Sequence, residues 1–158
     1  MKKIVIERMS IDDIKNVVNV ENDCFTTPWS KDSFLREITE NEVALYLVAK
    51  IENVAVGYIG VWRIQNEGHI TNVAVLPEYR GQHIGDMLMD ELEKKALELE
   101  MIGITLEVRI SNYGAQKLYT KHGYKPEGFR KKYYTDTNED AVIMWKYFPN
   151  YENYSDTL

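Results

Sequence analysis

Hydrophobic residues recur along this chain at two spacings, every second residue in some segments and every third or fourth residue in others. Together these patterns predict a mixture of strands and helices. Short apolar or alternating runs predict strands at residues 3–8, 43–50, 54–64, 68–76, 104–109 and 140–148. Apolar residues three or four positions apart predict helices after Ser10, at 31–40, at 82–100 and from a Ser111 cap to about residue 121. Residues 124–138 contain Pro126 and Gly128, and we expect a loop there.

The order of these elements predicts an α/β (α+β) fold. Strands follow one another early in the chain, which favours hairpins, whereas the later strands are separated by helices. This order predicts a mixed twisted sheet with helices on both faces. We expect one domain at 1–148 and a polar tail at 149–158.

The segment from Thr71 to Gly85, T-N-V-A-V-L-P-E-Y-R-G-Q-H-I-G, is the most informative motif. An apolar strand meets a proline, and a loop with two glycines leads into a long amphipathic helix. A helix N-terminus offers unpaired amides and a partial positive charge, so it is suited to phosphate. The chain contains neither G-x-G-x-x-G nor G-x-x-x-x-G-K-[ST].

The composition of the chain excludes some classes of function and favours others. A net charge of −6 argues against a nucleic-acid or anionic-membrane binder and leaves room for a cationic substrate. Cys24 is the single cysteine, so an internal disulfide is excluded, and a buried thiol is favoured over a nucleophile. His69, His83 and His122 are too far apart for a local metal motif, and we expect no metal. Without a membrane-length apolar run or a signal peptide, we expect a cytoplasmic protein.

Several motifs together resemble the GCN5-related N-acetyltransferase family. The loop R-x-x-G/x-x-G at residues 80–85 is typical of the superfamily. Four further segments resemble its ribosomal-protein-alanine N-acetyltransferase branch, and the resemblance covers about residues 5–146. They are Phe25-x-x-Pro28-Trp29-Ser30, Leu106-Glu107-Val108-Arg109-x-Ser111-Asn112, Leu118-Tyr119 with Gly123-Tyr124, and Arg130-x-x-Tyr133-Tyr134 followed by Glu139-Asp140-Ala141-x-Ile143-Met144.

The resemblance implies that acetyl-coenzyme A is the cosubstrate, bound in a cleft where two central parallel strands, 68–76 and 103–109, part. Backbone groups of residues 73–75 would pair with the pantetheine, and loop amides would hold the pyrophosphate. His83 stands where the family usually has glycine, and we expect helical backbone angles there. The implied coenzyme contacts are Val73, Ala74, Val75, Arg80, Gly81, Gln82, His83, Ile84, Gly85, Asp86 and Asn112.

The resemblance also implies the chemistry, which is direct acetyl transfer to the N-terminal alanine of a small-subunit ribosomal protein. Glu107 would be the general base and Tyr119 the general acid. Alternation alone favours a solvated strand face for Glu107, and helix packing for Tyr119. Trp29, Tyr133 and Tyr134 would flank the acceptor.

Two alternatives remain open. The chain could acetylate a small-molecule amine, or it could sense acyl-coenzyme A without catalysis. We expect a peptide N-terminus as partner, no nucleic acid or membrane, and a monomer or weak dimer.

Overall fold

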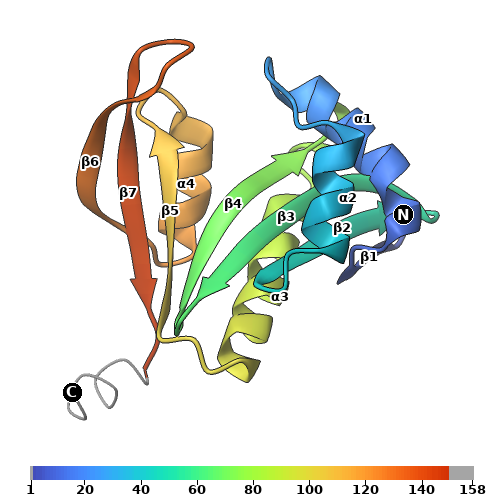
Figure 1. Ribbon diagram of the computed structural model, residues 1–158, viewed down its shortest axis with the longest axis horizontal. Helices are drawn as coiled ribbons and strands as arrows, with labels where there is room; N and C mark the ends of the chain where they lie inside the picture. Colours follow the sequence, from blue (N-terminus) through green and yellow to red (C-terminus); the bar gives the residue numbers. More distant parts are fainter. Residues whose placement is uncertain (1, 150–158) are drawn as a thin grey trace.

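A single twisted sheet organises residues 2–149, which are the residues that the computed structural model describes (Figure 1). Its strand order is β1-β2-β3-β4-β5-β7-β6. All neighbouring strands are antiparallel except β4 and β5, which are parallel. The strands are β1 (Ile4–Arg8), β2 (Ala44–Ile51), β3 (Val54–Ile64), β4 (Glu67–Val75), β5 (Gly103–Arg109), β6 (Lys125–Tyr134) and β7 (Glu139–Tyr147).

Helices cover both faces of the sheet. They are α1 (Ile14–Cys24), α2 (Lys31–Thr39), α3 (Ile84–Glu98) and α4 (Tyr113–Lys121), with short 3₁₀ turns at Ile11–Asp13 and Pro77–Tyr79. In Figure 1, α1 and α2 lie in front of β2–β4, whereas α3 and α4 lie behind the sheet. Among the described residues, no helix is long and apolar enough to span a membrane.

Alternation along each strand creates two hydrophobic cores. Tyr46 and Val48 of β2 pack with the buried faces of α1 and α2. Leu47 and Ala49, one residue out of phase, pack with α3. The two cores fix the helices against opposite faces of the same strands.

The parallel pair β4–β5 separates soon after it begins. The strands pair only at Glu67–Gly103, Gly68–Ile104 and His69–Thr105. Two residues later, Thr71 is an extra residue in β4 opposite β3, between the pairs Val61–Ile70 and Gly60–Asn72. Such a bulge bends a strand and increases its twist. The edge of β4 beyond His69 is therefore free of β5.

The structure confirms the fold class, and it corrects two local predictions. The expected loop at 124–138 is largely strand β6, which pairs with β7 through two register shifts. The cap of α4 is Asn112 rather than Ser111, because the Asn112 side chain accepts from the amide of Ala115 (3.1 Å). Apart from Pro149, the predicted polar tail lies outside the described residues.

Candidate active site

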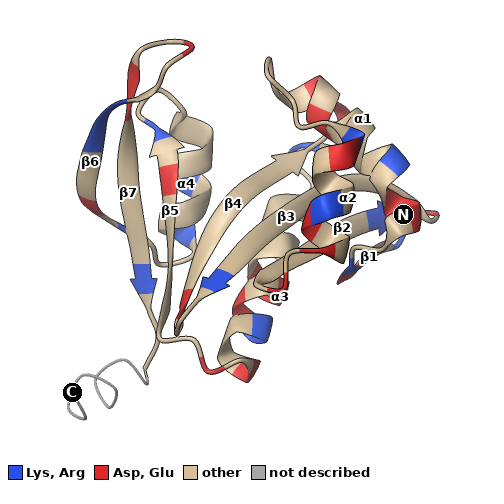
Figure 2. Ribbon diagram, viewed as in Figure 1, with Lys and Arg blue, Asp and Glu red and all other residues tan. Residues whose placement is uncertain are grey.

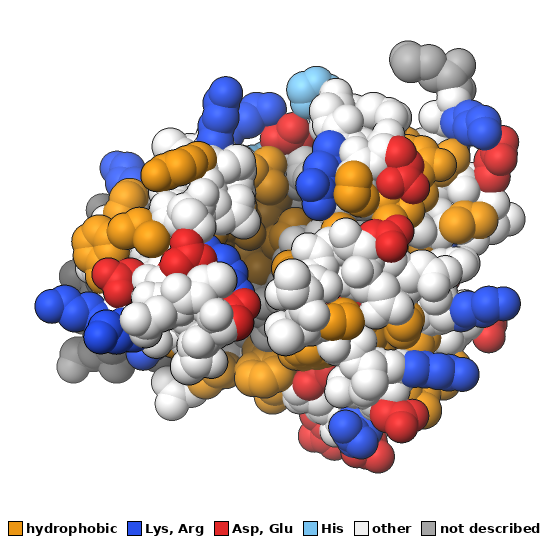
Figure 3. All heavy atoms as spheres, turned by 90° about the horizontal axis from the view of Figure 1, so that it is seen from above, with side chains coloured by type: hydrophobic (Ala, Val, Ile, Leu, Met, Phe, Trp, Pro, Cys, Tyr) orange, Lys and Arg blue, Asp and Glu red, His pale blue; other side chains and the backbone are white. Residues whose placement is uncertain are grey.

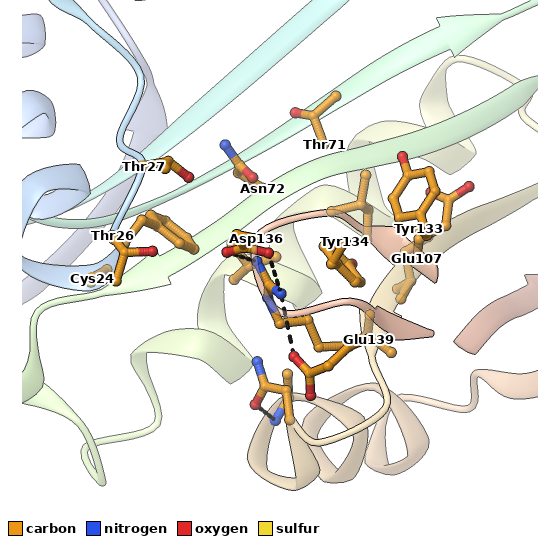
Figure 4. Close-up of a pocket in the computed structure, with 18 of the residues that line it drawn as sticks. Cys24, Thr26, Thr27, Thr71, Asn72, Glu107, Tyr133, Tyr134, Asp136 and Glu139 are labelled. Carbon is orange, nitrogen blue, oxygen red and sulfur yellow. Dashed lines mark hydrogen bonds and ion pairs between the residues drawn. The ribbon is translucent and has the colours of Figure 1, made fainter. Parts of the chain in front are cut away.

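A cleft of about 930 Å³ lies where β4 and β5 part. It is open to the surface between the α1–α2 side and the β6–β7 side (Figure 3). Thr26 and Thr27 lie across it from Tyr134 and Glu139 (Figure 4). Seven predicted site residues line it, namely Trp29, Val73, Glu107, Asn112, Tyr119, Tyr133 and Tyr134.

Glu107 is held by two basic side chains at the floor of this cleft. Oε2 of Glu107 lies 2.6 Å from Nε2 of His69, and Arg130 donates through Nε to Oε1 (3.1 Å). The Glu107 side chain is 10% exposed. Beyond its first residues β4 is drawn without charged residues in Figure 2, because the segment from His69 to Val75 carries no Asp, Glu, Lys or Arg. The carboxylate is therefore the anionic group of this part of the floor.

His69 is a site residue that the sequence prediction missed. Its hydrogen bond to Glu107 raises its pKa, and the same hydrogen bond lowers the pKa of Glu107. The two residues are 38 positions apart, so only the β4–β5 register brings them together. His69 is the last β4 residue paired with β5, and a register assigned to the two predicted strands would have suggested the contact.

Replacing His69 by Gln should destabilise the protein in a pH-dependent way. The raised pKa of His69 means that its contribution is fully present below about pH 6.5 and is lost as the pH rises through the raised value. The lowered pKa of Glu107 means that its contribution is present above about pH 4.3 and is lost at lower pH. Urea unfolding should show a larger loss in His69→Gln at pH 5.5 than at pH 9. An equal loss at both values would contradict a charged pair.

Tyr119 of α4 lines the same cleft. It is buried, its ring centroid lies 6.0 Å from that of Tyr124, and burial raises the pKa of its hydroxyl. The hydroxyl therefore stays protonated at neutral pH and can serve as a donor. Asn112 lines the cleft at the start of α4, where its carbonyl is occupied by the helix cap.

The unpaired edge of β4 leads through the turn after the strand to the first turn of α3, which is suited to an anionic group. The first helical bond of α3 runs from Met87 to His83, so the amides before Met87 lack helical partners. A Cβ built on Gly81 meets nothing within 4 Å, which leaves open space above the loop. Beyond the cleft lining, this segment from β4 to α3 contains the remaining predicted coenzyme residues: Ala74, Val75, Arg80, Gly81, Gln82, His83, Ile84, Gly85 and Asp86.

Some of these residues also have structural roles that the sequence did not show. Ala74 and Ile84 are buried in the two cores, so only their backbone groups are available to a ligand. A Cβ on Gly85 would lie 3.3 Å from Leu118, which means that this glycine also permits α3 to approach α4. Arg80 donates through Nε to the carbonyl of Val75 (3.1 Å) and secures the turn after β4.

The expected helical backbone at His83 is wrong. His83 is the N-cap of α3 and has a φ of 63°, the left-handed conformation that glycine adopts most readily. Its Nδ1 lies 3.1 Å from Asp86, which also contacts His122 and Lys121. Burial raises the pKa of Asp86, but the hydrogen bonds from His122, His83 and Lys121 outweigh burial and lower it to about 2. The loop therefore turns into α3 at a non-glycine residue whose side chain is tied to the first helical turn.

Substitutions at His83 should separate backbone strain from side-chain contact. Val is β-branched and tolerates a positive φ poorly, so His83→Val should lower the free energy of unfolding by about 1–2 kcal/mol relative to His83→Gly. Denaturant unfolding of the two variants measures this difference. Equal stability would argue against the left-handed conformation at this position.

The predicted acceptor residues form two aromatic walls. Trp29 follows α1, whereas Tyr133 and Tyr134 end β6 with their rings edge to face at 5.1 Å. The Arg109 guanidinium lies 4.1 Å from the Tyr134 ring centroid and donates to Asp136 (2.9 and 3.0 Å). Burial raises the pKa of Tyr134 to about 12. Through its contacts with Tyr134 and Asp136, Arg109 holds the turn between β6 and β7 beside the cleft.

Further lining residues were not among the predicted site residues. They include Glu21 of α1, Trp62 of β3, Thr71 and Asn72 of β4, and Asp136 of the turn between β6 and β7. Thr71 and Asn72 open the motif at residues 71–85, whereas the neighbours of Trp62 carry no functional signature. Residues 2–149 contain no group of three His, Cys, Asp or Glu arranged to hold a metal ion.

Comparison with known proteins identifies the class. Residues 14–124 match the model of the acetyltransferase (GNAT) family, so the chain belongs to that family. A Bacillus subtilis (strain 168) protein is 45% identical over 143 residues, covering 90% of this chain and 95% of that protein. It is named, provisionally, as a [ribosomal protein bS18]-alanine N-acetyltransferase.

Solved structures agree with this class. The ribosomal-protein-S18-alanine N-acetyltransferase from Escherichia coli is 27% identical with a TM-score of 0.82, covering 90% of this chain and 92% of that one. The PaiA N-acetyltransferase from Thermoplasma acidophilum, solved in complex with coenzyme A, is 25% identical with a TM-score of 0.79, covering 92% and 99%. The chain thus shares its fold with N-acetyltransferases, one of which was solved with coenzyme A bound.

Proposed function

We propose that this enzyme transfers acetyl from acetyl-coenzyme A to the N-terminal alanine of a small-subunit ribosomal protein. The observation that supports this most is the open cleft with Glu107 at its floor and aromatic walls on two sides. The names of the Bacillus subtilis and Escherichia coli relatives favour the same acceptor. Such a substrate implies action in the cytoplasm, where ribosomal proteins are made.

The coenzyme fits the residues that are present. The free edge of β4 offers backbone groups to the pantetheine amides in the manner of an added strand. The N-terminal amides of α3 and the open space at Gly81 suit the pyrophosphate. When bound there, acetyl-coenzyme A supplies an activated thioester.

Glu107 accepts the proton that the amine must lose. A protein α-amine has a pKa of about 7.7–8.0, so roughly a tenth of it is neutral at pH 7, compared with well under a thousandth of a lysine. A carboxylate with a lowered pKa is a weak base, but an amine that is already partly neutral needs little assistance. His69 and Arg130 orient the carboxylate for this step.

Tyr119 donates a proton to the sulfur that leaves. Its hydroxyl is protonated at neutral pH because burial raises its pKa. A high pKa makes the phenol a weak acid in isolation, so its contribution depends on alignment with a developing thiolate. The base and the acid lie in one cleft, on β5 and α4.

A panel of short peptides that differ in their first two residues tests the proposed acceptor. Purified enzyme with acetyl-coenzyme A should acetylate the α-amine of alanine-first peptides, detected by mass spectrometry. Transfer only to small-molecule amines would support the small-amine alternative. Tight coenzyme binding without transfer to any amine would support the sensor alternative.

Glu107→Gln should lower turnover about 10²–10⁴-fold with little change in the KM for acetyl-coenzyme A. Glutamine keeps the shape of the side chain but cannot accept a proton. The loss should shrink above pH 8, where the α-amine is already neutral. Steady-state rates across pH measure both effects. Wild-type turnover at neutral pH would leave Glu107 as a structural partner of His69 and Arg130.

Tyr119→Phe should slow the chemical step while keeping the packing of the ring. An acyl donor whose thiol is a better leaving group should recover part of the lost rate, because it needs less protonation. Single-turnover kinetics with two thioesters of different leaving-group pKa provide the test. A slow variant without such recovery would make Tyr119 a positioning residue.

A further inference from the structure

The proposed chemistry leaves one buried carboxylate of the cleft unused. Glu21 of α1 is 2% exposed, yet it belongs to the cleft lining. Its described contacts are with neutral donors. The Tyr58 hydroxyl donates to Oε2, and the Trp29 amide donates to Oε1 (3.1 Å). A buried carboxylate is costly unless hydrogen bonds satisfy it, so these contacts define its position.

Both ends of one cleft wall are attached to Glu21. The wall is the segment from Phe25 to Trp29, which connects α1 to the start of α2 and supplies four lining residues. The Phe25 amide donates to the main-chain carbonyl of Glu21 (3.0 Å), and the Trp29 amide donates to its side chain. Within the described residues, no hydrogen bond reaches Thr26, Thr27 or Pro28 between these points. The carboxylate is therefore the polar link that holds the far end of the wall.

An aromatic path connects the same two residues. The rings of Trp29 and Phe34 lie 5.5 Å apart, and those of Phe34 and Tyr58 lie 5.5 Å apart at 89°. Tyr58 then returns to Glu21 through its hydroxyl. The Trp29 ring and the Trp29 backbone are thus fixed by separate contacts that meet at Glu21.

We propose that Glu21 is a positioning residue of the acceptor site. Its carboxylate holds the segment Phe25–Trp29 in the place where the first residues of the acceptor pack, and it acts without touching the acetyl group. This proposal rests on the proposed function, which places a peptide N-terminus against that wall. It predicts that changes at Glu21 affect acceptor binding rather than coenzyme binding.

Two substitutions of similar size separate anchoring from charge. Glu21→Met removes both hydrogen bonds, and it should raise the KM for an alanine-first peptide about ten- to hundredfold, the loss expected for a hydrogen bond to a charged group. The KM for acetyl-coenzyme A should stay within about twofold, since hydrogen bonds to coenzyme groups are unchanged. Glu21→Gln keeps an oxygen for the Trp29 amide, and it should restore the peptide KM to within about threefold because it retains that bond.

Asp13 provides a matched control. It is also a buried carboxylate, held by Lys50 (2.6 Å) and Ser10 (2.8 Å), and it is absent from the cleft lining. Asp13→Asn should lower thermal stability without changing the peptide KM.

Hydrogen exchange gives a readout that does not depend on activity. In the substrate-free enzyme, the Trp29 amide should exchange faster in Glu21→Met than in the wild type or in Glu21→Gln. If Glu21→Met does not fold, Tyr58→Phe removes one donor to the same carboxylate and keeps the ring. Amides of residues 25–29 should then exchange faster, and unchanged exchange would count against the proposal.

Three results would overturn the proposal. The first is a Glu21→Met variant with the peptide KM and the hydrogen exchange of the wild type. The second is an equal rise of the KM for peptide and the KM for acetyl-coenzyme A in that variant. The third is a Glu21→Gln variant whose peptide KM rises as much as that of Glu21→Met, which would make charge the cause. Failure of the proposed function is distinct. In that case the wild-type enzyme would acetylate no peptide at all, and hydrogen exchange would still test the anchor.

Discussion

The short pairing of β4 with β5 is the constraint on which the cleft depends. After three residue pairs the strands part, and the backbone groups along that edge of β4 lose the partners that a continuous sheet would supply. Buried backbone groups need hydrogen-bond partners, so such an edge must face water or a ligand. The same separation opens the cleft that Glu107 of β5 and Tyr119 of α4 both line. One change in strand pairing thus creates a free strand edge and an open cleft together.

Around this gap, ionisable side chains are fixed by one another rather than left free. Glu107 is held by His69 and Arg130, and Arg109 is held by Asp136 and by Glu139 (3.3 Å). A site whose polar groups are already oriented needs little rearrangement when charge develops during a reaction. The cost is that the carboxylate of Glu107 becomes a weaker base, because the hydrogen bond from His69 lowers its pKa. An α-amine tolerates a weak base far better than a lysine does.

Most of the fold could be predicted from local sequence patterns, whereas the site depended on long-range register. Six strands and four helices followed from apolar periodicity. Strand β6 did not, because it is an edge strand with mostly exposed residues, a proline and two register shifts, so no apolar alternation marks it. The left-handed conformation at His83 was missed because a residue other than glycine ordinarily adopts a negative φ. The contacts of Glu107 with His69, and of Glu21 with Tyr58, join residues 38 and 37 positions apart, and no local pattern records them.

The overall charge of the chain has the same sign as that of its proposed cosubstrate. The chain carries a net charge of −6, and yet its proposed cosubstrate is an anion. Fixed dipoles can hold phosphate without a surplus of lysines, and the free amides at the start of α3 provide them. The lysine near that turn, Lys121, is already paired with Asp86 (3.1 Å). The helix dipole acts mainly near the first turn of α3, whereas the cleft lining contains Glu21, a carboxylate whose hydrogen-bond donors are neutral. On the proposed function, the N-terminal end of α3, outside the cleft lining, suits the anionic coenzyme, and the cleft between the aromatic walls suits a cationic peptide N-terminus.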